Sequence, residues 1–127
     1  RFIPGAEEDM ILTIKSLAGP GIDFETISRK PATAAPFEGA AVDAIRRAVD
    51  AEDPGAVVLP YLNSAGTDAK GFAVLPDGRR INYYGCTPLR LPADFDFINL
   101  FHGVDERVPV GSLVFGAKVV DHILQEA

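Results

Sequence analysis

The residues with the clearest chemical potential surround position 102. His102 follows an apolar stretch that ends in Leu100 and Phe101, and Gly103 comes next. An imidazole that leaves a buried element at a glycine-bearing turn can direct a ring nitrogen at a zinc ion, with a nearby carboxylate or carbonyl fixing its tautomer. The other interpretation is a turn histidine that hydrogen-bonds within its own loop. The residue types alone leave both open.

A charged triplet, Asp105, Glu106 and Arg107, follows this histidine. Such side chains commonly form a solvated cluster that contributes little to stability. The alternative is a supporting role, in which an acid raises the basicity of His102 and Arg107 holds the turn.

A second group of polar residues lies in the loop that starts at Gly66. Gly66 and Thr67 precede a short expected helix, so backbone N–H groups and a hydroxyl could face an anion or a developing oxyanion. Thr67 or Asp68 could equally serve as an ordinary N-cap. Lys70 could approach a substrate carboxylate as a point charge, or could simply be solvated. A nucleotide cradle is the weakest interpretation, because the loop lacks the glycine and lysine patterns of phosphate-binding loops.

The remaining candidates carry little signal. Cys86 is the single cysteine, so no internal disulfide can form, and a reducing cytoplasmic compartment is expected. It follows Gly85 in an apolar neighbourhood with no evident base beside it, which predicts a core filler. His122 falls on the polar face of the last expected helix, where no role is assigned to it.

Composition limits the class of partner. The chain has 127 residues, 47% of them apolar, and a formal net charge of -6. Because nucleic acid and anionic lipid both attract basic surfaces, we expect neither nucleic acid nor membrane as a partner. No apolar run approaches the roughly 20 residues of a membrane span. The first residues, RFIPG, lack Met and a signal-peptide pattern, which is typical of a chain entered within a strand.

The elements that must position these residues follow from apolar periodicity. Three acids at 7–9 and apolar residues at helical spacing predict a helix that ends at Gly19. Alternation over 22–28 predicts a strand, which makes residues 2–28 a β-α-β unit. The aperiodic, proline-bearing stretch 29–36 is the expected domain boundary.

Beyond that boundary the pattern is that of an α/β domain. The expected elements are a helix up to Asp50, a strand over 57–60, a short helix around 69–74, a strand over 80–84, an irregular stretch over 89–100 and a C-terminal helix. The last helix carries an apolar stripe, expected to pack on a sheet, of Leu113, Ala117, Val120 and Leu124.

Three blocks in fixed order, GTDAK at 66–70, YG at 84–85 and HGVDERV at 102–108, resemble the C-terminal signature of the zinc-dependent peptidase M-twenty family. That family includes aminoacylases, carboxypeptidases, dipeptidases and succinyl-diaminopimelate desuccinylase. The resemblance covers nearly the whole chain and implies an α/β fold in two parts. Residues 1–31 would be the C-terminal part of a lid and dimerisation domain, a ferredoxin-like α+β unit. Residues 32–127 would be the C-terminal part of the catalytic domain, with a mostly parallel sheet.

The resemblance also implies roles for particular residues. His102 corresponds to the last zinc ligand of a two-zinc centre, and Arg1 corresponds to a lid arginine that grips the substrate carboxylate. Gly66 and Thr67 match the loop that lines the substrate pocket, and Lys70 stands where many relatives have arginine, which puts a bidentate contact in doubt.

The activity implied is hydrolysis of the amide bond of a dipeptide or N-acyl amino acid by zinc-activated water, with a glutamate as base. The other zinc ligands and that glutamate belong to the N-terminal half of such enzymes, and their motifs are not found in this sequence. We therefore expect no catalytic residue here, an inactive isolated chain, and two partners: the missing N-terminal half and a second copy. The alternative function is a non-catalytic dimerisation module that uses the lid-like sheet edge.

Overall fold

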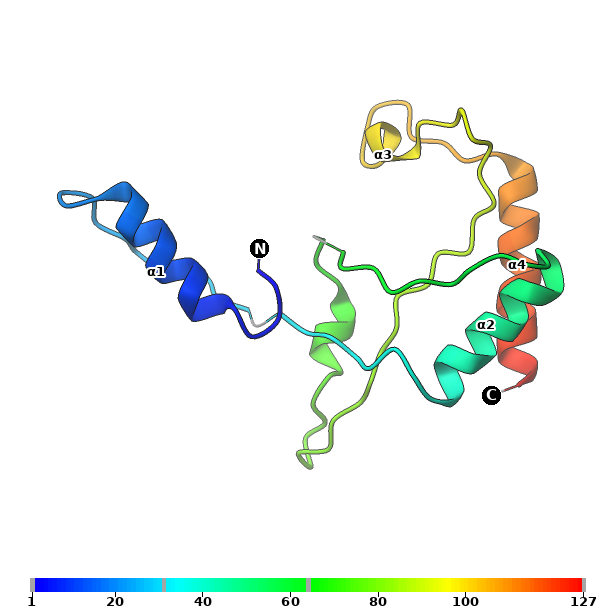
Figure 1. Cartoon of the computed structure of the whole chain (residues 1–127), viewed down its shortest axis with the longest axis horizontal. Helices are drawn as coiled ribbons and strands as arrows, with labels where there is room; N and C mark the ends of the chain where they lie inside the picture. Colours follow the sequence, from blue (N-terminus) through cyan, green and yellow to red (C-terminus); the bar gives the residue numbers. More distant parts are fainter. Residues whose placement is uncertain (1, 31, 64, 127) are drawn as a thin grey trace. The chain divides into compact units, whose positions relative to one another are not determined.

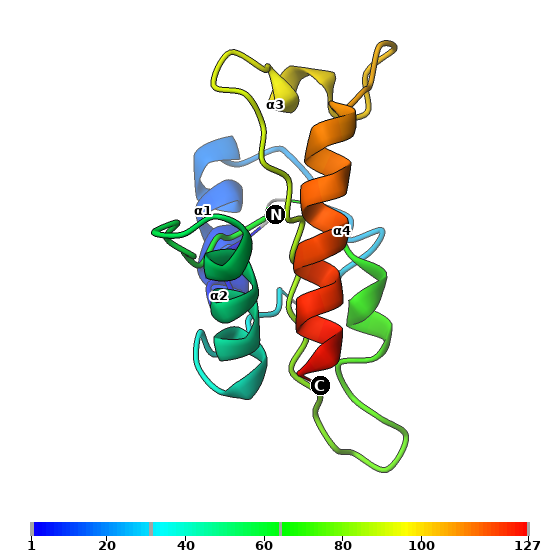
Figure 2. The same cartoon turned by 90° about the vertical axis from the view of Figure 1, so that its right-hand side faces the viewer.

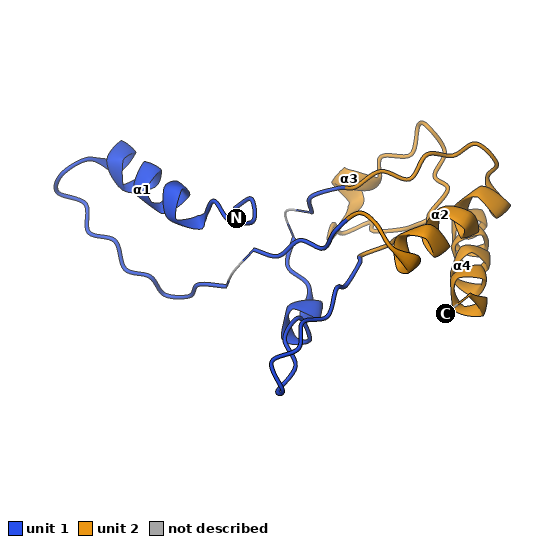
Figure 3. Cartoon of the chain, turned by 60° about the horizontal axis from the view of Figure 1, so that its bottom comes forward, with its two compact units in different colours: residues 1–36, 61–84 blue, residues 37–60, 85–127 orange. Residues whose placement is uncertain are grey.

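The computed structural model describes residues 2–30, 32–63 and 65–126. These residues form two compact units, each built from two separate stretches of chain (Figure 3). Unit 1 comprises residues 1–36 and 61–84, and unit 2 comprises residues 37–60 and 85–127. Residues 32–36 and 61–84 therefore group with the N-terminal part of the chain. The sequence places the boundary within 29–36, and the division after residue 31 is the one that the resemblance implies.

Unit 1 begins with helix α1 (Glu7–Ala18), as the sequence predicts. Acids occupy its first turn and Lys15 its last, both of which complement the helix dipole. Gly19 ends the helix in a left-handed conformation, at φ 76°. None of the described side chains of α1 is buried, so this helix contributes no core of its own.

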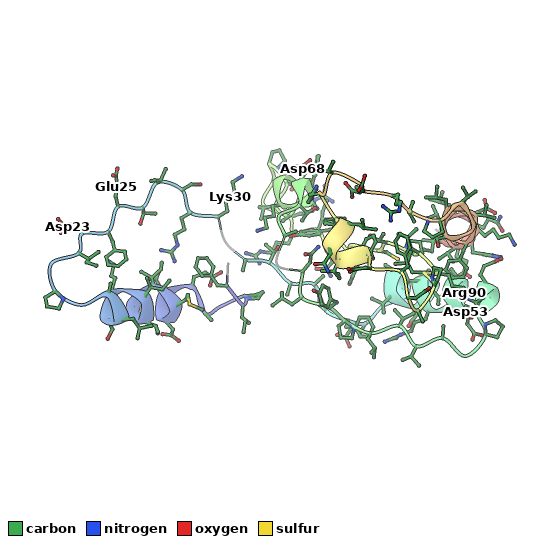
Figure 4. All side chains as sticks on the ribbon, turned by 90° about the horizontal axis from the view of Figure 1, so that it is seen from above. Asp23, Glu25, Lys30, Asp53, Asp68 and Arg90 are labelled. Carbon is green, nitrogen blue, oxygen red and sulfur yellow. The ribbon has the colours of Figure 1, made fainter. Side chains whose placement is uncertain are left out.

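The chain after α1 returns beside the helix and is tied to its first turn. Arg29 pairs with Glu8 at 2.7 Å, and the Ala32 N–H donates to a Glu7 carboxylate oxygen at 3.0 Å. In the segment between α1 and Arg29, the side chains of Asp23 and Glu25 point away from α1 (Figure 4). This agrees with the alternation that the sequence indicates for 22–28.

The stretches expected as strands form no ladder among the described residues. The single β-bridge there joins Val74 to Arg80 in a hairpin around Gly78, and residues 22–28 and 57–60 are irregular. A strand depends on a neighbour for its backbone hydrogen bonds, and the described chain brings no such neighbour to these stretches. The α/β fold with a parallel sheet remains a prediction.

Two tyrosine side chains link residues 61–84 to the N-terminal part of unit 1. The Tyr83 and Thr33 hydroxyls share a hydrogen bond, and the Tyr84 hydroxyl donates to the Pro36 carbonyl at 3.0 Å. This part of unit 1 also holds the 3-10 helix η1 (Asp68–Gly71), which is shorter than the helix expected around 69–74.

Unit 2 is a pair of packed helices, α2 (Ala40–Glu52) and α4 (Val110–Gln125), which lie side by side in Figures 1 and 2. Both helices are predicted by the sequence. The buried side chains at their contact are small or β-branched: Val42, Ala44, Ala48, Ser112 and Val119. The one-turn helix α3 (Phe97–Leu100) lies in the stretch expected to be irregular.

The face of α4 that packs differs from the expected apolar stripe. Ser112, Gly116 and Val119 are buried, whereas Leu113 and Leu124 are 52% and 69% exposed. Gly116 is so close to the preceding segment that an added Cβ would lie 2.5 Å from the Pro88 carbonyl oxygen. Close approach of backbones selects small residues at this contact, and the bulkier stripe is left facing outward.

Polar contacts join the C-terminal end of α2 to the C-terminal half of α4. Glu52 of α2 accepts a hydrogen bond from His122 at 3.1 Å when that ring nitrogen is protonated, and it lies 3.3 Å from the Lys118 ammonium. The hydrogen bond from His122, assisted by Lys118, holds the pKa of Glu52 below its ordinary value. Asp53 pairs with Arg90 at 3.3 Å, and the two lie together in Figure 4.

Among the described residues, no helix combines the length and the apolar character needed to cross a membrane.

Candidate functional site

The candidate site is the turn that follows α3, in unit 2. Asp96 caps this helix: its carboxylate accepts from the Asn99 backbone N–H at 3.4 Å and from the Asn99 side-chain amide at 2.7 Å. The Gly103 N–H donates to the Leu100 carbonyl at 2.8 Å and closes the turn. A Cβ on Gly103 would lie 3.0 Å from the same carbonyl oxygen, so a larger residue would crowd the turn.

His102 sits inside this turn with a left-handed backbone, at φ 61°. It is the one non-glycine residue with positive φ in the part of the chain that the structure describes. Such a conformation costs a residue with a Cβ on the order of 1–3 kcal/mol. Strain of this kind persists where the surroundings impose it, and it is concentrated at functional sites.

The His102 side chain is exposed and lies against an aromatic ring. The ring centroids of His102 and Phe101 are 4.5 Å apart at an interplanar angle of 58°, and Phe101 in turn lies 5.5 Å from Phe97. The imidazole makes no hydrogen bond with any other described residue. An unprotonated ring nitrogen of His102 is therefore available as a metal ligand in the described structure.

The charged triplet after His102 is fully on the surface. The Arg107 guanidinium donates to the Asp105 carbonyl at 3.0 Å, a contact within the triplet itself. Neither Asp105 nor Glu106 contacts the imidazole through a hydrogen bond or an ion pair in the described structure. The carboxylate support for His102, which the sequence leaves as the alternative to a solvated cluster, is not formed among the described residues.

The turn contains a single imidazole that could bind a metal ion. No group of three or more histidine, cysteine, aspartate or glutamate side chains converges anywhere in the described residues. A zinc centre requires three or four protein ligands, so the donor set around His102 does not fit a complete centre by itself.

The other expected binding residues belong to unit 1. Thr67 is the N-cap of η1, and its hydroxyl accepts from the Ala69 N–H at 3.3 Å, which is the capping alternative. Gly66 is exposed and Lys70 half-buried. Arg1 lies outside the described residues.

Two side chains differ from their sequence-based interpretation. Cys86 is exposed and is therefore not the expected core filler. Partial desolvation raises the pKa of its thiol. His122, to which the sequence assigns no role, contacts Glu52, which is 70 positions away in the chain. No local pattern in the sequence could reveal that contact.

The chain matches no protein-family model, no curated protein and no solved structure.

Proposed function

We propose that the chain is the C-terminal portion of a di-zinc metallopeptidase or amidohydrolase, to which it contributes His102 as one metal ligand. The observation that carries the proposal is the conformation of His102. The chain holds a histidine in a strained, left-handed backbone, exposes its ring and leaves its nitrogens without a hydrogen bond in the described structure. A turn histidine that only served its own loop would be expected to bond to that loop.

The proposed substrate is a dipeptide or N-acyl amino acid with a free carboxylate, and the compartment is the cytoplasm. Support comes from the motif order GTDAK, YG and HGVDERV, which resembles the family signature. Under this proposal the resemblance assigns substrate contacts to Arg1, Gly66, Thr67 and Lys70. The remaining zinc ligands and the general base come from the missing N-terminal half, so the isolated chain is inactive.

The outward stripe of α4 is consistent with a chain that packs against further structure. Leu113 is 52%, Val120 43% and Leu124 69% exposed, although they form one apolar face of a four-turn helix. A contiguous apolar face of this kind commonly marks a surface that another part of a protein covers.

Hydrolysis assays test the proposal. The purified chain should show no hydrolysis of dipeptides or N-acyl amino acids, and a longer protein that includes an N-terminal half should show hydrolysis that chelator abolishes. In that longer protein His102→Ala should remove turnover, whereas His122→Ala should retain it. Chelator-sensitive hydrolysis by the isolated chain, or turnover that survives His102→Ala, would contradict the proposal.

A second candidate function is a non-catalytic association module, favoured by the apolar surface of unit 1. Leu12 and Leu17 of α1 are 63% and 83% exposed, and Ile27 in the segment that runs back beside α1 is 92% exposed. The described part of unit 1 leaves these side chains uncovered, whereas a second copy could cover them. Light scattering across a concentration series separates the two candidate functions. Association that is abolished by Leu17→Glu but unchanged by His102→Ala would favour the association module.

A further inference from the structure

Three aromatic rings meet in a row at the candidate site. Phe97 and Phe101 are four positions apart, the spacing at which side chains meet along a helix, and their ring centroids are 5.5 Å apart at 50°. His102 extends the row, with its ring centroid 4.5 Å from that of Phe101. Neighbouring side chains ordinarily point in different directions. Here the left-handed backbone of His102 accompanies a direct contact between consecutive rings.

We infer that Phe101 is a positioning residue that fixes the orientation of the His102 imidazole. In most metal sites a hydrogen bond from the second ring nitrogen sets the orientation of a ligating histidine. His102 has no such bond in the described structure, and the carboxylates of Asp105 and Glu106 do not contact it. The tilted contact with Phe101 restricts the ring and leaves both nitrogens free.

The support behind Phe101 is itself anchored. Asp96 caps α3 through the Asn99 backbone and side chain, and the Phe101 N–H donates to the Phe97 carbonyl at 3.1 Å. Aromatic pairs of this tilted geometry contribute enough to favour the observed ring orientation about 2- to 12-fold. That the oriented nitrogen then serves a zinc ion rests on the proposed function, but the orientation itself does not.

Nuclear magnetic resonance of the full chain tests the inference. The ring protons of His102 should show cross-relaxation with those of Phe101 and should carry a ring-current shift from it. Phe101→Leu keeps an apolar side chain but removes the ring, so it should abolish this shift. Phe101→Tyr keeps the ring and should restore it. His122, the only other histidine in the sequence, contacts Glu52 on α2 and should be unaffected by both variants.

Two results would overturn the inference: no cross-relaxation between Phe101 and His102 in the unaltered chain, or the same His102 ring shifts in Phe101→Leu as in the unaltered chain. The first needs no variant, so it decides the matter even if Phe101→Leu fails to fold. The proposed function fails separately, if added Zn²⁺ leaves the His102 resonances of the unaltered chain unchanged while the Phe101 signature is present.

Discussion

Replacing Gly116 with alanine should destabilise unit 2, although alanine is the better helix former. The added Cβ would lie 2.5 Å from the Pro88 carbonyl oxygen and 3.6 Å from its carbon. Because the first of these is a backbone atom, the helix or the segment must move to relieve the clash, at an overpacking cost of about 1–3 kcal/mol. The helix gains about 0.5–1 kcal/mol from losing a glycine. The expected net change is a loss of up to about 2.5 kcal/mol in the free energy of unfolding.

Gly111 is the matched control, because it lies in the same helix and a Cβ there would meet no atom within 4 Å. Gly111→Ala should therefore raise the free energy of unfolding by up to about 1 kcal/mol. Urea denaturation followed by circular dichroism measures both variants. If Gly116→Ala stabilised the chain as much as Gly111→Ala, α4 would not pack against the segment at Pro88 in solution, and the account of unit 2 would be refuted.

Three further predictions concern the same unit. Since the hydrogen bond from His122 lowers the pKa of Glu52 in the folded chain, this contact stabilises the fold above the ordinary glutamate pKa. That stability is lost as the pH falls through the lower pKa that Glu52 has in the folded chain. Between neutral pH and roughly pH 3, the urea midpoint of the unaltered chain should therefore fall further than that of Glu52→Gln. His102→Gly should be more stable than His102→Ala by about 1–2 kcal/mol in urea denaturation, because only glycine accepts φ 61° without strain; equal stability would argue against the left-handed turn. Val119→Ala, at a fully buried position, should cost about 1.5–3 kcal/mol in thermal and urea unfolding, whereas Leu124→Ala should change stability by less than about 0.5 kcal/mol; similar losses would mean that the buried and exposed faces of α4 are wrongly assigned.

The helices could be read from the sequence because their signals are local. The acids before Met10 and the glycine after Ala18 delimit α1, and apolar periodicity indicates α2 and α4. The packed face of α4 could not be read in this way. Hydrophobicity selects Leu113 and its stripe, whereas close approach to α2 and Pro88 depends on the small residues at 112 and 116.

The strands and the site depended on information that local patterns lack. Alternation over 22–28 predicts which side chains share a face, and Asp23 and Glu25 do point the same way, but alternation does not supply a strand to pair with. At the site, glycine at 103 signals a turn, yet nothing local signals that the histidine before it adopts the left-handed conformation. The partner of His122 is likewise set by packing between α2 and α4.

The proposed role of His102 can be tested by Zn²⁺ binding to the purified chain, measured by equilibrium dialysis with elemental analysis and by resonance shifts of the two histidines. We expect no tightly retained zinc, because one imidazole is not enough to hold it. Added Zn²⁺ should instead bind weakly and shift the resonances of His102, an effect that His102→Ala removes. Retention of about two zinc ions per chain after dialysis, or shifts confined to His122, would contradict this role.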